Sequence, residues 1–226
     1  MTEKELLLKN PCESYFVTGC MMCTAGFLEA YTYILKGGVF ANAQTGNMAL
    51  LALAIADSNP VRAVFCIIPM IAYIIGIWLT LSMPKRMQKG LRWESVLVLL
   101  EILVFAVIGF LPPTAPHAIS TIAVSFVCAI QYNTFTKAHG IPMATTFCTN
   151  NFRQAVINFY HAFHRTDADA GRRAWFFVRH LLCFLCGGVA GGFLCRFLSE
   201  RAIWVNAIFL IPAAVVMIVS DKKRET

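Results

Sequence analysis

The sequence has few charged residues for its length. Asp, Glu, Lys and Arg make up 14% of its 226 residues, whereas 58% of the residues are apolar. A soluble domain of this size has no need of so much apolar sequence. Between Tyr15 and Val219 the apolar runs repeatedly reach the roughly 18 residues that a helix needs to cross a bilayer. The composition predicts an all-α membrane protein that crosses the bilayer several times.

The sequence also lacks the motifs of common enzymes. It has no nucleotide-binding glycine loop, no supported Ser-His-Asp arrangement and no zinc-protease helix, so we expect no enzyme, cofactor or metal. Its net charge of +7 comes largely from Lys and Arg in loops and at the C-terminus. Such residues set membrane topology, so we expect no nucleic-acid partner. The nine cysteines lie mostly in apolar runs, where a thiol packs as a small apolar group.

One polar stretch occurs twice. Residues 37–47 match residues 141–151 at an offset of 104, and the register continues outside the motif, where Glu29 falls on Asn133. A constant offset over about thirty residues indicates an internal duplication. We therefore predict a single transmembrane domain over 1–226. It would contain repeat one at 14–111, repeat two at 117–220, and a tail at 221–226.

The apolar run after the first motif is too short for a full crossing. Residues 48–56 would form about 14 Å of helix, about half of a hydrocarbon core near 30 Å. We interpret each motif as a re-entrant segment followed by a half-helix, with Thr45 or Asn47 capping the first one. The full spans are predicted at 14–35, 61–83, 94–111, 117–137, 174–197 and 202–220.

The basic residues distinguish two topologies. Six spans plus two half-helices place most Lys and Arg residues on one side, whereas eight crossings distribute them almost evenly. The positive-inside rule favours six spans, with both termini cytoplasmic in an inner membrane. Three spans per repeat make the two repeats inverted. Inverted repeats with interrupted helices are typical of transporters, where half-helix N-termini face a solute.

The candidate solute site lies at these half-helices. Glu29 is a mid-span acid that faces a cavity and couples proton movement, or else is a neutral acid hydrogen-bonded between helices. Arg153 attracts an anion or pairs with Glu29, or else extends to the membrane surface. The amides and hydroxyls bind a polar solute, or else satisfy the backbone of the turns. The full candidate set is Glu29, Asn42, Gln44, Thr45, Gly46, Asn47, Gln131, Asn133, Thr145, Thr146, Thr149, Asn150, Asn151 and Arg153.

Two cysteine pairs suggest a different chemistry. Cys20-x-x-Cys23 and Cys183-x-x-Cys186 have the soft ligands that Cu(I) prefers. The pairs do not coincide under the repeat, and neither lies on the polar motif. We therefore interpret them as packing residues.

The repeated motif resembles the YoaK-like family of uncharacterised bacterial membrane proteins. The resemblance lies in Gly26-Phe27-Leu28-Glu29-Ala30, Gly37-Gly38-Val39-Phe40-Ala41-Asn42, Thr45-Gly46-Asn47, Gln131, Ala144-Thr145-Thr146 and Thr149-Asn150-Asn151. Family members often have Asp where Glu29 stands, and often have Gly where this chain has Asn150. The resemblance implies membrane location and a repeat architecture, and it brings no established substrate.

These observations predict a transporter or permease for a small polar or ionic solute. Glu29 favours a proton-coupled carrier over the alternative, a channel. A sensor or assembly subunit without transport is the other alternative. The expected partners are the solute and the bilayer, and a homo-oligomer is compatible with the sequence.

Overall fold

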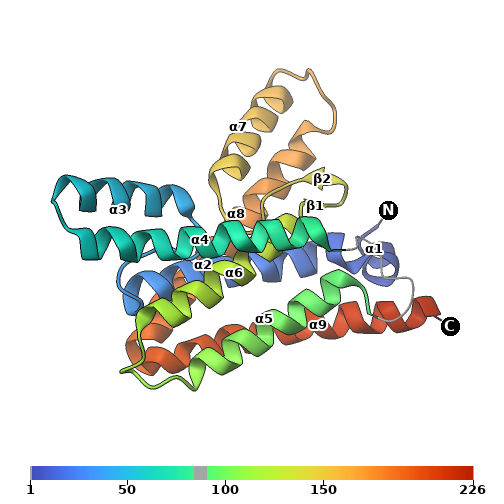
Figure 1. The fold of residues 1–226 in the computed structure, drawn as a ribbon. Coiled ribbons are helices and arrows are strands. Elements are labelled where there is room, and N and C mark those ends of the chain that lie inside the picture. Colours follow the sequence, from blue (N-terminus) through green and yellow to red (C-terminus); the bar gives the residue numbers. More distant parts are fainter. Residues whose placement is uncertain (1, 84–90, 226) are drawn as a thin grey trace.

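The computed structural model describes residues 2–83 and 91–225, which are mostly helical (Figure 1). Pro84, expected to end a span, and the basic residues Lys85, Arg86 and Lys89 lie outside the described residues. The elements are α1 (Glu3–Lys9), the 3₁₀ helix η1 (Pro11–Glu13), α2 (Tyr15–Leu35), α3 (Gln44–Ala56), α4 (Pro60–Ser82), α5 (Trp93–Gly109), α6 (His117–Thr134), β1 (Lys137–Ala138), β2 (Ile141–Pro142), α7 (Thr149–Phe163), α8 (Ala170–Leu198), the 3₁₀ helix η2 (Ser199–Arg201) and α9 (Ala202–Glu225).

The outer surface of the bundle is apolar. Large side chains such as Trp78 (75% exposed) and Phe193 (59% exposed) point outward from α4 and α8, whereas many polar side chains are buried. Two helical stretches, Pro60–Ser82 and Ala170–Arg224, are long and apolar enough to cross a membrane. A lipid environment favours this distribution, because apolar side chains can face lipid without a free-energy penalty.

The long helices of the bundle pack in pairs. Helix α2 packs along α8 and α4 packs along α6, while α5 pairs with α9. Helices α2 and α8 run parallel, since Cys23 meets Gly187 and Phe27 meets Gly191.

Helices α4 and α6 also run parallel, since Gly76 meets Phe126 and Thr80 meets Asn133. The short helix α3 lies along α4, and α7 lies along α8. Both termini lie at the same end of the bundle (Figure 1).

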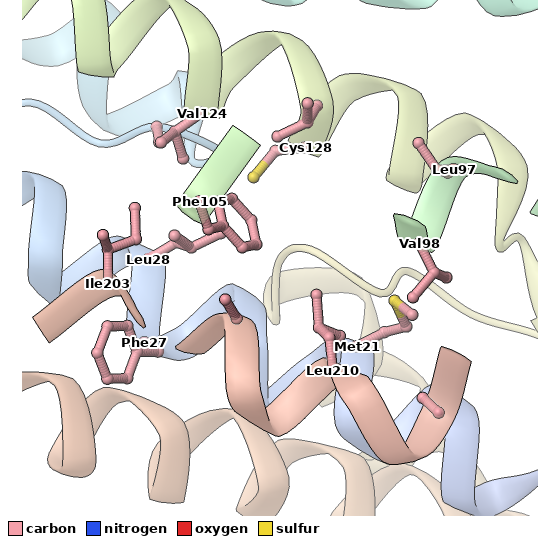
Figure 2. Close-up of a cluster of buried hydrophobic side chains, with 14 of the residues drawn as sticks. Met21, Phe27, Leu28, Leu97, Val98, Phe105, Val124, Cys128, Ile203 and Leu210 are labelled. Atoms are coloured by element: carbon pink, nitrogen blue, oxygen red, sulfur yellow. The ribbon is translucent and has the colours of Figure 1, made fainter. Parts of the chain in front are cut away.

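The main apolar core lies where four helices meet. Figure 2 shows Phe27 and Leu28 of α2 close to Phe105 of α5 and Ile203 of α9, with Val124 of α6 nearby. All five side chains are almost completely buried. In a bilayer such side chains stabilise helix association through van der Waals packing, and this packing fixes the positions of the helices that carry the polar motif.

Most helix bounds agree with the sequence prediction to within a few residues, but some details differ. The capping prediction was wrong, since α3 begins at Gln44 and Thr45 and Asn47 lie inside the helix. Helix α1 was not predicted, although the Thr2 hydroxyl and the Glu5 carboxylate form a capping box there. The antiparallel pair β1–β2 was also not predicted. Helix α9 continues through most of the expected tail.

Candidate functional site

The two copies of the polar motif form the same clamp. The Asn47 side chain accepts a hydrogen bond from the Phe40 N–H at 2.8 Å and donates one to the Phe40 carbonyl. The Asn151 side chain accepts from the Ala144 N–H at 3.2 Å and donates to the Ala144 carbonyl at 2.8 Å. Both asparagines thus hold the backbone of the residue seven positions earlier. They satisfy buried backbone groups, as the alternative interpretation of the motif expected.

Other predicted site residues also form hydrogen bonds or close contacts within the protein. The Gln44 amide donates to the Ala41 carbonyl at 3.1 Å and accepts from the Asn47 amide at 3.0 Å. The Thr145 hydroxyl donates to the Phe135 carbonyl at 3.4 Å. A Cβ added at Gly46 would lie 2.6 Å from the Phe40 ring, so this position has no room for a side chain. These residues shape the loops before α3 and α7.

The chain reverses into the bundle after α2. Gly37 and Gly38 have φ of +77° and +68°, a backbone conformation that glycine adopts most readily. The loop then descends until the Asn42 amide nitrogen lies 3.4 Å from the Ala25 carbonyl, halfway along α2. Helix α3 starts from this depth. It ends near the start of α4, where Arg62 donates to the Gly37 and Gly38 carbonyls.

Glu29 lies where the starts of the two short helices approach each other. Its two carboxylate oxygens are buried without a hydrogen-bond partner. The N–H of Ala43, the residue before α3, faces this carboxylate, although the geometry falls short of a hydrogen bond. Cys148, the residue before α7, is close enough to feel the charge of Glu29. The acid therefore lies between the N-termini of α3 and α7.

Further unpartnered oxygens belong to α2, α6 and the loops before α3 and α7. The Gln131 side-chain amide donates to the Met21 and Thr145 carbonyls, both at 3.5 Å. These bonds join α6 to α2 and to the loop before α7. The amide oxygens of Asn42 and Gln131 have no partner, and neither have the hydroxyls of Thr24 and Thr146. Native proteins leave few buried polar atoms unsatisfied, so this concentration indicates a place for water or a ligand.

The remaining predicted residues lie away from this centre. Asn133, the counterpart of Glu29, donates to the Thr80 hydroxyl at 2.9 Å. Thr45, Thr149 and Asn150 are exposed in the first turns of α3 and α7. Arg153 is exposed on α7 and forms no ion pair with Glu29 within the described chain. These side chains therefore do not belong to the group of buried unpartnered oxygens.

Two adjoining pockets open near the end of α6. One of about 410 Å³ is lined by residues of α4, α5 and α6, and one of about 280 Å³ lies beside the second loop. Both include Asn133 and Thr136, and the smaller pocket also includes Asn150. Glu29 lines neither pocket. These pockets form a vestibule with a mixed polar and apolar lining on the side of the bundle where both termini lie.

Sequence reasoning missed some residues of the interior. Thr24 and Tyr73 have no counterpart in the repeated motif, and a single hydroxyl in an apolar span gives no signal of its own. Tyr73 lies beside Thr146 and near Cys128. Glu101 of α5 is a second mid-span acid outside the predicted site, and its carboxylate is fully buried without a partner.

The cysteine pairs meet across one helix contact. Cys20 and Cys23 of α2 lie near Cys183 and Cys186 of α8. All nine thiols are free. Among residues 2–83 and 91–225, no three His, Cys, Asp or Glu side chains are grouped as metal ligands. We therefore keep the interpretation of both cysteine pairs as packing residues.

Comparison with known proteins identifies the family. Residues 17–218 match the family described as "Protein of unknown function (DUF1275)". The chain belongs to the DUF1275 family. A curated relative of this DUF1275 chain, "UPF0700 transmembrane protein YoaK" of Bacillus subtilis (strain 168), is 32% identical over 131 residues. The match covers 54% of the chain and 56% of that relative, so it spans little more than half of either protein.

These comparisons confirm the resemblance to YoaK-like proteins and support the predicted membrane location of the DUF1275 chain. No solved structure matches it. The family brings no assigned activity, so its function has to be argued from the site.

Proposed function

We propose that this protein is a membrane carrier for a small polar or ionic solute, coupled to protons through Glu29. One observation carries the proposal: an acid without a partner lies near the starts of both α3 and α7, and the loops before these helices carry further unpartnered oxygens. Ionisable groups inside a membrane are costly and typically mark solute or proton pathways. Half-helix N-termini at mid-depth are a recurrent feature of transporter sites.

The helix directions support an inverted repeat of six spans and two half-helices. Helix α3 runs from Glu29 toward the end where α4 begins, as the contact of Arg62 with Gly37 shows. Helix α7 leads to the start of α8 at Ala170, and His180, further along α8, lies 2.9 Å from Thr18 near the beginning of α2. This order along α8 supports an exit of α7 on the side where α2 begins, opposite to the exit of α3. Three full spans per repeat then follow, with both termini on the cytoplasmic side.

A carrier explains the burial of the acid better than an open channel does. An open channel keeps its pore groups in contact with water, whereas a carrier passes through states in which the site is closed. The Glu29 oxygens are closed off, and the vestibule at Asn133 stops short of them. The structure fits a carrier state in which Glu29 is closed off from water while the vestibule at Asn133 is open.

Proton movement in liposomes tests this function. Purified protein is reconstituted with a pH-sensitive dye inside, and small amines, amino acids and carboxylates are added outside. We expect at least one solute to change the internal pH, and the change should vanish in Glu29→Gln. Asp169→Asn, an acid-to-amide change at an exposed loop residue, serves as the control. No solute-dependent change, or equal changes in Glu29→Gln and wild type, would refute proton-coupled transport.

A further inference from the structure

The unpartnered side-chain atoms of α2, α6 and the loops before α3 and α7 share one chemical property. All of them are oxygens, and they include both carboxylate oxygens of Glu29, the amide oxygens of Asn42 and Gln131, and the hydroxyl oxygens of Thr24 and Thr146. Apart from Glu29, which is half-buried, these residues are at most 1% exposed. We call these five residues the oxygen cluster. A ligand that enters it meets acceptors first.

The amide oxygens cannot exchange places with their nitrogens at low cost. The Asn42 nitrogen donates to the Ala25 carbonyl, and the Gln131 nitrogen donates to the Met21 and Thr145 carbonyls. Flipping either amide would set an oxygen against a carbonyl oxygen. The nitrogens are therefore held by the backbone, and the two oxygens remain as acceptors without donors.

The protein supplies no cation to this cluster from its described residues. Lys36 pairs with Glu200, Arg62 donates to loop carbonyls, and Arg153 is exposed. None of the ion pairs within the described part of the chain includes Glu29. The N-terminus of α3 would attract an anion, but the carboxyl group of Glu29 already faces that position. The cluster is therefore unsuited to an external anion.

We propose that the oxygen cluster binds a small monovalent cation, either an alkali metal ion or a primary ammonium group. Hard cations take oxygen ligands from carboxylate, amide and hydroxyl groups. An ammonium group offers three donors to the same acceptors. This inference rests on the proposed transport function, because it names the class of solute or coupling ion that the carrier would take.

Thermal unfolding of the full chain in detergent tests the inference. Lithium, sodium, potassium and methylammonium chlorides are compared with N-methylglucamine chloride, whose cation is too large for a closed interior site, at equal chloride concentration. We expect one of the small cations to raise Tm in a saturable manner, because a ligand that binds only the folded state stabilises it. An alkali ion and methylammonium in separate samples distinguish the two kinds of cation.

Variants of the cluster make the test specific. Glu29→Gln should raise the half-saturating cation concentration by at least about tenfold, whereas Asp169→Asn should leave it unchanged. Thr24→Val and Thr146→Val remove one unpartnered oxygen at nearly constant shape. They should raise Tm without cation, since an unsatisfied buried hydroxyl is lost, and should weaken the cation effect. A structural hydroxyl would give the opposite change in Tm.

Three results would overturn the cation site: no small cation exceeds N-methylglucamine, the effect is equal in Glu29→Gln and wild type, or only a change of anion raises Tm. Binding is measured without any flux, so the two proposals can fail separately. Saturable cation binding without solute-dependent proton movement would refute transport alone. Proton movement without cation binding would refute the cation site alone.

Discussion

The contact between α2 and α8 allows a sharp test of the packing that positions Glu29. The helices touch through glycines: a Cβ added at Gly187 would lie 1.8 Å from the Cys23 carbonyl oxygen. At Gly191 the nearest atom, the Phe27 carbonyl oxygen, would be 2.8 Å away. Nothing lies within 4 Å of a Cβ at Gly192, in the same helix. Small residues at helix contacts allow such close approach in membranes.

Gly187→Ala should therefore destabilise the protein, and Gly192→Ala should not. Ordinary contact begins near 3.4 Å, so at Gly187 the helices would have to separate by about 1.6 Å (3.4 minus 1.8). Overpacking of this kind costs about 1–3 kcal/mol, and more where backbone is the obstacle. At Gly192 the change removes helix-destabilising glycine and should contribute about 0.5–1 kcal/mol of stability.

Equilibrium unfolding in mixed detergent micelles, followed by circular dichroism, measures the difference. We expect Gly187→Ala to unfold at a lower fraction of denaturing detergent than wild type, and Gly192→Ala at an equal or higher fraction. Gly191→Ala should fall between them. Equal midpoints for Gly187→Ala and Gly192→Ala, or the reverse order, would refute the contact between α2 and α8.

Three further predictions concern the loops. Asn47→Ala and Asn151→Ala should each lower the free energy of unfolding by about 1–3 kcal/mol through loss of the paired backbone hydrogen bonds; wild-type stability in both would contradict the clamps. Single cysteines in loops 57–62 and 162–171 of a cysteine-free background should be labelled from opposite sides of the membrane, and same-side labelling would exclude the inverted repeat. The paired Arg173 side chain lowers the pKa of Asp167, so its contribution to loop order is present above about pH 4 and is lost as the pH falls further; hydrogen exchange of the loop should show this loss in wild type but not in Asp167→Asn.

The correspondence between the two polar stretches could be predicted from sequence because it preserves spacing. The offset of 104 placed Asn47 on Asn151, and the structure gives both residues the same two bonds to Phe40 and Ala144. The offset did not indicate what those amides bind. An exposed solute group and a backbone peptide offer an amide the same donors and acceptors, so residue type alone cannot decide between them.

Contacts between distant segments were beyond sequence reasoning. Gln131 meets Met21 across 110 positions, and Glu29 lies near Cys148 across 119 positions (148 minus 29). Periodicity describes only one helix at a time, so it cannot say which faces meet. The cap of α3 was mispredicted for a related reason: the Asn47 side chain is used by Phe40, which no local pattern indicates.

A comparison of the two polar stretches distinguishes residues that hold the loops in place from residues that could bind a ligand. Where the copies agree, at Asn47 and Asn151, the side chains are saturated by the backbone and hold the loops in place. Where they differ, at Glu29 and Asn133, one side chain is left without a partner and the other is satisfied by Thr80. Two equal acids at a shared centre would repel each other, so Asn133 in place of a second acid fits the proposed site for one cation. The two asparagine clamps hold the loops, and Glu29 supplies the acid of the proposed site.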